Sequence, residues 1–204
     1  MSGFRIGIIL GSLVLASAAA QAPGPSRVRG TITSFDGNVL SVKSREGQDL
    51  KIELAPNATF AYMKKVDLAD IKPGTPLGTT AVRDKEGRLV ARELHLFNPD
   101  KPIPGEGHRP WDLEPNSTMT NGSVTSIANA RVESADGREL TLKYKDGEQR
   151  VLIPAGIPIV MAVDGDRSLV KPGETAYIAV NAAPDGKLTA MRVQVSKDGV
   201  KPPQ

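Results

Sequence analysis

The sequence predicts a mainly β protein composed of two small closed barrels arranged in tandem. Short stretches in which apolar and polar residues alternate are separated by Gly-containing turns, and this is the pattern of half-exposed β-strands. The same order of stretches occurs twice along the 204 residues. Each copy is about 75 residues long, which is too short for a sandwich of two full sheets and suitable for a small closed barrel.

Residues 1–20 are predicted to be a secretory signal peptide. Arg5 supplies a positive charge, an apolar stretch follows, and Ala18-Ala19-Ala20 forms a cleavage site of small residues. The apolar stretch contains about 15 residues, whereas a helix that spans a bilayer needs about 20. Cleavage is therefore favoured over retention as an anchor, with no stable membrane span afterwards, and the protein is expected to be periplasmic or secreted.

The first copy covers residues 27–97 and contains five predicted strands. In the third strand, Leu50 and Ile52 share one face while Lys51 and Glu53 share the other, as in a strand exposed to water on one side. Five strands with a short helix between the third and the fourth is the order of an OB-like barrel. The predicted elements are strands 28–34, 38–44 and 48–55, a helix at 66–71, and strands 77–83 and 88–97.

The second copy covers residues 122–196 and repeats the turns and apolar positions of the first. Gly122 opens the sequence GSVTS as Gly30 opens GTITS, and the Lys-Pro-Gly that ends at Gly74 recurs at Gly173. The offset between the copies is 92 residues at the first pair and 99 at the second, which indicates an insertion in the second copy. We interpret the pattern as a duplication that gives two tandem barrels. Two interleaved sheets in one larger sandwich are the alternative.

Residues 98–121 connect the two copies and have no counterpart elsewhere in the chain. They contain five of the 16 prolines and the only tryptophan, Trp111. Arg109 and Trp111 are the candidate interaction residues, because arginine and tryptophan are enriched at binding hot spots. The favoured interpretation is structural: Trp111 fills the seam between the barrels while the prolines stiffen the connection. The tail, residues 197–204, is predicted to be flexible.

Three sequence features resemble an uncharacterised family of exported bacterial proteins with OB-like β-barrel domains. They are the repeated opening, the Lys-Pro-Gly before the fourth strand, and the linker sequence GHRPWDLEPNSTMTNG at residues 107–122. The resemblance covers most of the chain after residue 20 and implies the barrel fold, but it says little about activity. Members are sometimes labelled as metal transporter components, and this sequence has neither a bundle of membrane helices nor a nucleotide-binding loop.

Composition and motifs argue against nucleic-acid binding and catalysis. Aromatic residues make up 4% of the chain and the net charge is only +3, so neither base stacking nor a basic face is expected. The sequence has no nucleophile elbow, no Gly-rich phosphate loop, and no cysteine for nucleophilic, redox or Cys-zinc chemistry. We therefore expect a protein that is not an enzyme and that has no cofactor.

The sequence favours a non-enzymatic binding or scaffolding protein of the cell envelope, with an unidentified envelope protein or glycan as its partner. The alternative is a periplasmic copper- or zinc-binding protein that uses residues of the linker. Its candidate ligands are His108, nearby acids such as Asp112, and Met119, since imidazole, carboxylate and thioether groups bind soft or borderline ions. Their spacing matches no ligand template, so metal binding is the second choice.

Overall fold

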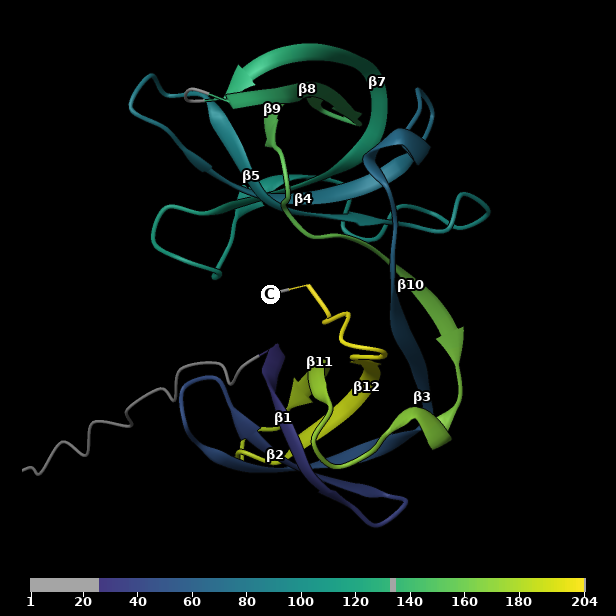
Figure 1. The fold of residues 1–204 in the computed structure, drawn as a ribbon. Coiled ribbons are helices and arrows are strands. Elements are labelled where there is room, and N and C mark those ends of the chain that lie inside the picture. Colours follow the sequence, from purple (N-terminus) through teal and green to yellow (C-terminus); the bar gives the residue numbers. More distant parts are fainter. Residues whose placement is uncertain (1–25, 133–134, 204) are drawn as a thin grey trace, which may run out of the picture.

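The structure, a computed structural model, describes residues 26–132 and 135–203. In those residues it is mainly β, with twelve strands and two three-residue 3-10 helices, so the predicted class is confirmed. Two closed barrels lie one above the other and are joined by a pair of strands, as Figure 1 shows. The predicted signal peptide at residues 1–20 lies outside the described residues.

The strands follow the two copies and the linker in order. The first copy contains β1 (Arg27–Phe35), β2 (Val39–Ser44), β3 (Asp49–Lys65), β4 (Pro76–Arg83) and β5 (Leu89–Leu96). The linker contains β6 (Gly107–Pro110). The second copy contains β7 (Thr118–Val132), β8 (Ala135–Tyr144), β9 (Gly147–Pro154), β10 (Ile159–Gly165), β11 (Thr175–Ala182) and β12 (Leu188–Val195).

Each barrel is built from strands of both copies. Barrel A is the circuit β1-β2-β3-β12-β11, in which β12 pairs in parallel with β3 and β11 pairs antiparallel with β1. Barrel B is the circuit β7-β8-β9-β5-β4, which is closed by the parallel β5–β9 pair and the antiparallel β4–β7 pair. The first copy therefore supplies three strands to barrel A and two to barrel B, and the second copy does the reverse.

This exchange of strands differs from the predicted tandem arrangement, in which each copy forms a barrel by itself. The reason lies in β3, which the sequence predicts to end at residue 55 and which instead continues to Lys65. Its outer half pairs antiparallel with β10, from Phe60 opposite Gly165 to Lys65 opposite Val160. These two strands carry the chain between the barrels, so the last two strands of each copy arrive in the barrel begun by the other copy.

Pro56 does not end β3, because the ladder between β3 and β12 is interrupted at this point. Leu54 pairs with Ala190, and the next pair along the ladder is Thr59 with Arg192. A proline has no N–H to donate and is tolerated in a strand at such an irregularity. The alternation then resumes, and Phe60 is buried in the core of barrel A.

The predicted short helices between the third and fourth strands are reduced to single 3-10 turns. These turns are η1 (Leu68–Asp70) and η2 (Arg167–Leu169), and no α-helix occurs in the described residues. Pro73 and Gly74 follow η1 closely, and Gly74 has a φ of +92°, so the chain cannot continue as a helix there. Within residues 26–132 and 135–203, no helix has the length and apolar character required to cross a bilayer.

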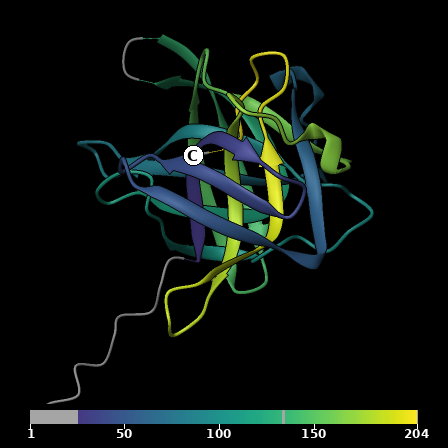
Figure 2. The same ribbon diagram turned by 90° about the horizontal axis from the view of Figure 1, so that it is seen from below.

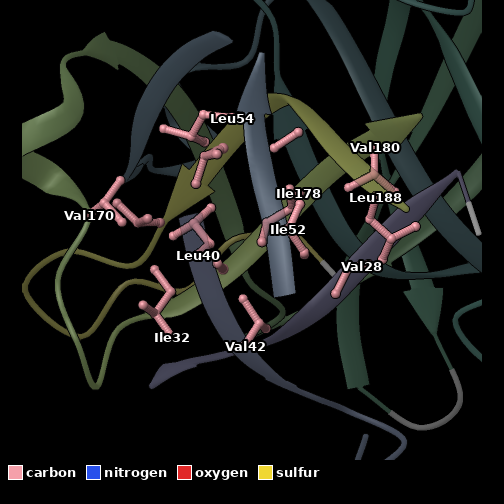
Figure 3. Close-up of a cluster of buried hydrophobic side chains, with 14 of the residues drawn as sticks. Val28, Ile32, Leu40, Val42, Ile52, Leu54, Val170, Ile178, Val180 and Leu188 are labelled. Carbon is pink, nitrogen blue, oxygen red and sulfur yellow. The ribbon is translucent and has the colours of Figure 1, made fainter. Parts of the chain in front are cut away.

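Each barrel encloses its own apolar core, and each core combines residues of both copies. In barrel A, Ile32 and Ile52 from the first copy pack with Ile178 and Val193 from the second, and none is more than 1% exposed (Figure 3). The core of barrel B includes Leu77, Leu94, Val124, Leu140, Val151 and Ile159. Because burial of apolar surface is the main stabilising contribution to folding, neither copy could assemble its core alone in this arrangement.

The glycine that opens each copy is required by a close approach of two strands. A Cβ atom on Gly30 would lie 2.2 Å from the carbonyl oxygen of Lys43, and one on Gly122 would lie 2.5 Å from that of Lys143. A β-bulge follows in each strand and increases its bend. The repeated opening sequence is therefore explained by the curvature of the two barrels.

Candidate ligand-binding cavity between the barrels

The space between the two barrels contains a cavity of about 730 Å³. Its walls come from β5 and β7 of barrel B, β11 and β12 of barrel A, the paired strands β3 and β10, and the linker. Viewed from below, the strands of barrel A lie in front of those of barrel B (Figure 2). Because residues of both barrels line it, the cavity lies between the barrels. A volume of this size is typical of pockets that hold small organic ligands.

The C-terminal tail enters the same space. Lys197 and Val200 form a turn through two backbone hydrogen bonds of 3.1 and 2.9 Å. Beyond the turn the chain lies between the barrels in Figure 1, where Pro202 is buried and Pro203 lines the cavity. The structure thus gives the tail a defined path as far as Pro203, and the path ends at the cavity wall.

The strand register aligns the cavity-facing side chains of barrel B. His95 on β5 and Asn121 on β7 both pair with Gly78 on β4, so the three residues form one row across the sheet. A Cβ atom on Gly78 would lie 2.5 Å from Oδ1 of Asn121 and 3.1 Å from Nδ1 of His95. The absence of a side chain at Gly78 therefore lets His95 and Asn121 approach each other over β4.

His95 is held in its neutral form. Its side chain is 13% exposed, and Oε1 of Glu93 lies 3.8 Å from its Nε2, which is too far for a hydrogen bond. Burial, with a smaller contribution from the positive charge of Arg109, lowers the pKa of His95 from 6.5 to about 4. At neutral pH the imidazole ring therefore offers one N–H donor and one acceptor.

Four buried side-chain polar atoms in the described part of the chain have no hydrogen-bond partner: Arg29 Nε, His95 Nε2, Trp111 Nε1 and Asn121 Oδ1. The last three belong to residues that line the cavity. Buried polar atoms in folded proteins are usually paired, because leaving one unpaired costs about 1–3 kcal/mol. Their concentration around one cavity indicates a place where a bound molecule could supply the missing partners.

The linker is fixed to barrel A through Trp111 and Asp112. The guanidinium group of Arg27 lies 4.0 Å from the centroid of the Trp111 ring, and that of Arg109 lies 5.4 Å from it. Asp112 accepts two hydrogen bonds from Arg29, at 2.9 and 3.2 Å. Partial burial alone would raise the pKa of Asp112, but these hydrogen bonds and the charges of Arg29 and Arg27 outweigh it and lower the pKa. The contacts hold Trp111 at the cavity wall.

The candidate metal ligands of the linker are not brought together. His108 on β6 pairs with Thr120 on β7, and Nδ1 of His108 lies 2.8 Å from Oγ1 of Thr120. Met119 is the next residue of β7, so its side chain points to the opposite face, where it lines the cavity. Asp112 is engaged by the arginines of β1. The part of the chain that the structure describes has no group of three or more His, Cys, Asp or Glu side chains placed to hold a metal ion.

The sequence singles out two of the residues that line the cavity and does not single out two others. Arg109 and Trp111, the candidate interaction residues, both line it. His95 and Asn121 were missed, because the alternation around His95 predicts only an ordinary polar strand face, and nothing local shows that a second barrel covers that face. Asn121 is the last residue of the predicted linker, directly before the repeat opens at Gly122, and no local pattern distinguishes it.

Comparisons of the chain with protein-family models, with curated proteins and with solved structures find no match. No activity can therefore be transferred from a relative to this cavity. Its chemistry has to be inferred from the side chains that line it.

Proposed function

We propose that the protein is a non-enzymatic binding protein of the cell envelope, periplasmic or secreted, that holds a small organic ligand in the cavity between its barrels. The observation that carries the proposal is that three of the residues lining this cavity hold a buried polar atom without a hydrogen-bond partner: His95 Nε2, Trp111 Nε1 and Asn121 Oδ1. Such atoms raise the energy of the empty protein, and a ligand that pairs with them gains affinity from removing that cost.

The architecture supports a binding role over a purely structural one. If the three strands from one copy are numbered one to three and the two from the other copy four and five, the strands pair in the order 1-2-3-5-4 in each barrel. We take this as an OB-like order. The exchange of strands ties the two barrels together through β3 and β10, so the two faces that enclose the cavity are held opposite each other. Pockets between such units are a common location for ligands.

Copper or zinc binding through His108, Asp112 and Met119 has less support, because these side chains lie on different faces or are already paired. A role as a scaffold for an envelope protein or glycan would not by itself explain the unpaired atoms of the residues that line the cavity. We therefore place a small ligand first.

A cavity-filling substitution tests the proposal. Ala162 lines the cavity, so Ala162→Phe should occupy the ligand's space, whereas Ala128→Phe adds the same ring at an exposed position of β7. In a thermal-shift screen of sugars, amino acids and organic acids, we expect at least one compound to raise the Tm of the wild type and of Ala128→Phe but not of Ala162→Phe. The proposal fails if no compound stabilises the protein, or if those that do stabilise Ala162→Phe equally.

A further inference from the structure

We propose that the ligand is an amphipathic organic anion, whose negatively charged head group binds Arg109 beside Trp111 and whose apolar body lies on the methionine and phenylalanine side chains of the cavity. This inference rests on the proposed function, because it names the chemical class of the ligand for the same cavity. It is carried by the charge balance of the lining residues and by the hydrogen bonds of Arg109.

The charged residues that line the cavity are unequal in number. In the described part of the chain, three are cationic (Lys101, Arg109 and Arg192) and one, Asp164, is a carboxylate. His95 adds no positive charge at neutral pH because burial lowers its pKa to about 4. The cavity therefore has an excess of positive charge, and field lines in a cavity with low-dielectric walls concentrate ions of the opposite sign.

The one carboxylate, Asp164, is already paired with the two other cations. Oδ2 of Asp164 lies 2.9 Å from Nζ of Lys101, and Oδ1 lies 3.7 Å from Nη2 of Arg192. No ion pair of the described residues includes Arg109. Asp164 can neutralise only one of the two charges on Lys101 and Arg192, and Arg109 has no ion-pair partner at all among the described residues.

Arg109 also has hydrogen-bonding capacity to spare. One of its terminal nitrogens donates to the carbonyl oxygen of Gly105 at 2.5 Å, whereas a guanidinium group has five N–H donors in a planar fork. Partial burial, followed by the positive charge of Arg27, lowers the pKa of Arg109, so the protein itself disfavours the charge that the side chain carries. A carboxylate or a similar oxyanion matches the fork geometry and would remove this penalty.

The neighbourhood of Arg109 favours the same ligand group. The indole N–H of Trp111 is buried and has no acceptor, and Trp111 lies beside Arg109 at the cavity wall. Asp112, the carboxylate closest to Trp111 in sequence, is bound by Arg29 and does not line the cavity. An incoming anion would therefore give the Trp111 N–H its missing acceptor and would accept from the N–H groups of Arg109 that do not bond to Gly105.

The rest of the lining is suited to an apolar body. The larger aliphatic, thioether and phenyl side chains among the lining residues are Met63, Leu96, Phe97, Met119, Met161 and Val163. Methionine side chains are flexible and polarisable, and they adapt to ligands of irregular shape. On β7, which pairs with the strand of Arg109, Oδ1 of Asn121 is an acceptor without a donor, which favours a ligand with a hydroxyl or amide group on its body.

Trp111 makes the test direct, because it is the only tryptophan and its emission reports on this wall of the cavity. The purified protein is titrated separately with octanoate, 1-octanol and octylamine, which share a chain and differ in head-group charge. We expect octanoate to change the Trp111 emission saturably and to bind at least tenfold more tightly than 1-octanol, with no saturable change for octylamine.

Variants of Arg109 test whether this residue causes the preference for octanoate over 1-octanol. We expect Arg109→Gln to weaken octanoate binding at least tenfold and to abolish its advantage over 1-octanol, and Arg109→Lys to retain part of that advantage. Arg138→Gln, at an exposed arginine of β8, should bind octanoate like the wild type. Near-UV circular dichroism checks that each variant keeps the native environment of Trp111.

The outcomes separate this inference from the function on which it rests. If 1-octanol binds as tightly as octanoate and Arg109→Gln changes neither, the cavity binds ligands but not through an anionic group, and the inference is wrong. The inference is also overturned if octylamine is preferred, or if none of the three probes changes the Trp111 emission. The proposed function is judged independently, by the screen with Ala162→Phe.

Discussion

The two barrel faces that enclose the cavity occupy equivalent places in the two copies but carry different side chains. On barrel B, the row across β5, β4 and β7 consists of His95, Gly78 and Asn121. On barrel A, the equivalent row across β12, β11 and β1 consists of Gln194, Tyr177 and Arg29. All three positions of the barrel B row thus differ from their counterparts in size, charge or hydrogen-bonding character.

The positions that close the barrels have remained alike. Leu89 pairs with Val151 in barrel B, and Leu188 pairs with Ile52 in barrel A at an offset of 99 residues in both strands. A duplicated chain therefore keeps apolar residues and register where the barrels close, and differs between copies where the barrels face each other. The difference separates the positions that maintain the fold from the positions that give the cavity its chemistry.

The largest expected effect concerns the glycines that the two copies share. Gly30→Ala and Gly122→Ala should each lower the free energy of unfolding by about 3 kcal/mol, because the new methyl group would meet a backbone oxygen at 2.2 and 2.5 Å respectively. Urea denaturation monitored by circular dichroism measures both. Gly147→Ala is the control, since its nearest neighbour, the hydroxyl of Tyr144 at 3.3 Å, can move. A loss at only one of the two glycines would contradict the equivalence of the barrels.

Replacing His95 by its counterpart in the other copy tests the difference between the two faces. The unfolded chain protonates this histidine near pH 6.5, whereas the folded protein does so only near pH 4. The contribution of His95 to the free energy of unfolding is therefore fully present above pH 6.5. As the pH falls to 4, the free energy of unfolding decreases by on the order of 3 kcal/mol. Urea denaturation at several pH values should show this loss of stability between pH 6.5 and 4 in the wild type but not in His95→Gln. Parallel curves for the two proteins would show that His95 is not held neutral.

Trp111→Ala should have a smaller effect, about 2 kcal/mol, because the indole is only half-buried but loses its contacts with Arg27 and Arg109. Chemical denaturation followed by circular dichroism measures the change, since the fluorescence probe is removed. Trp111→Phe should recover part of the loss by restoring an aromatic face. Unchanged stability in Trp111→Ala would mean that this residue does not join the linker to barrel A and serves only as a contact.

Deletion of residues 201–204 should have the smallest effect on stability, about 1 kcal/mol, since Pro202 is the one buried residue among the described residues 201–203. Because Pro203 lines the cavity, the deletion should enlarge it and strengthen octanoate binding by about threefold. Titration of the Trp111 emission measures the affinity, with Lys201→Ala as a full-length control. Weaker binding after the deletion would show that the tail forms part of the site.

The sequence predicted the strands and the barrel closure well, because alternation, turn glycines and the repeat are local signals. The prediction that β3 ends at Pro56 was wrong, because an interruption in the β3–β12 ladder allows the strand to continue. As a consequence, the last two strands of each copy lie in the barrel begun by the other copy. The cavity could not be predicted for the same reason. Arg109 and Trp111 stood out by residue type, whereas His95 and Asn121 matter only because the exchange places a second barrel against their face.

The exchange of strands is the claim on which the cavity depends, and disulfide formation tests it directly. The chain has no cysteine, so two introduced cysteines report on a single strand pairing. Thr31 on β1 is the pairing partner of Thr175 on β11, whereas a tandem barrel would place Thr31 opposite Pro76, the counterpart of Thr175. We expect Thr31→Cys with Thr175→Cys to form an intramolecular disulfide under mild oxidation, as measured by mass spectrometry. A disulfide in Thr31→Cys with Pro76→Cys, and none in the first pair, would contradict the exchanged arrangement.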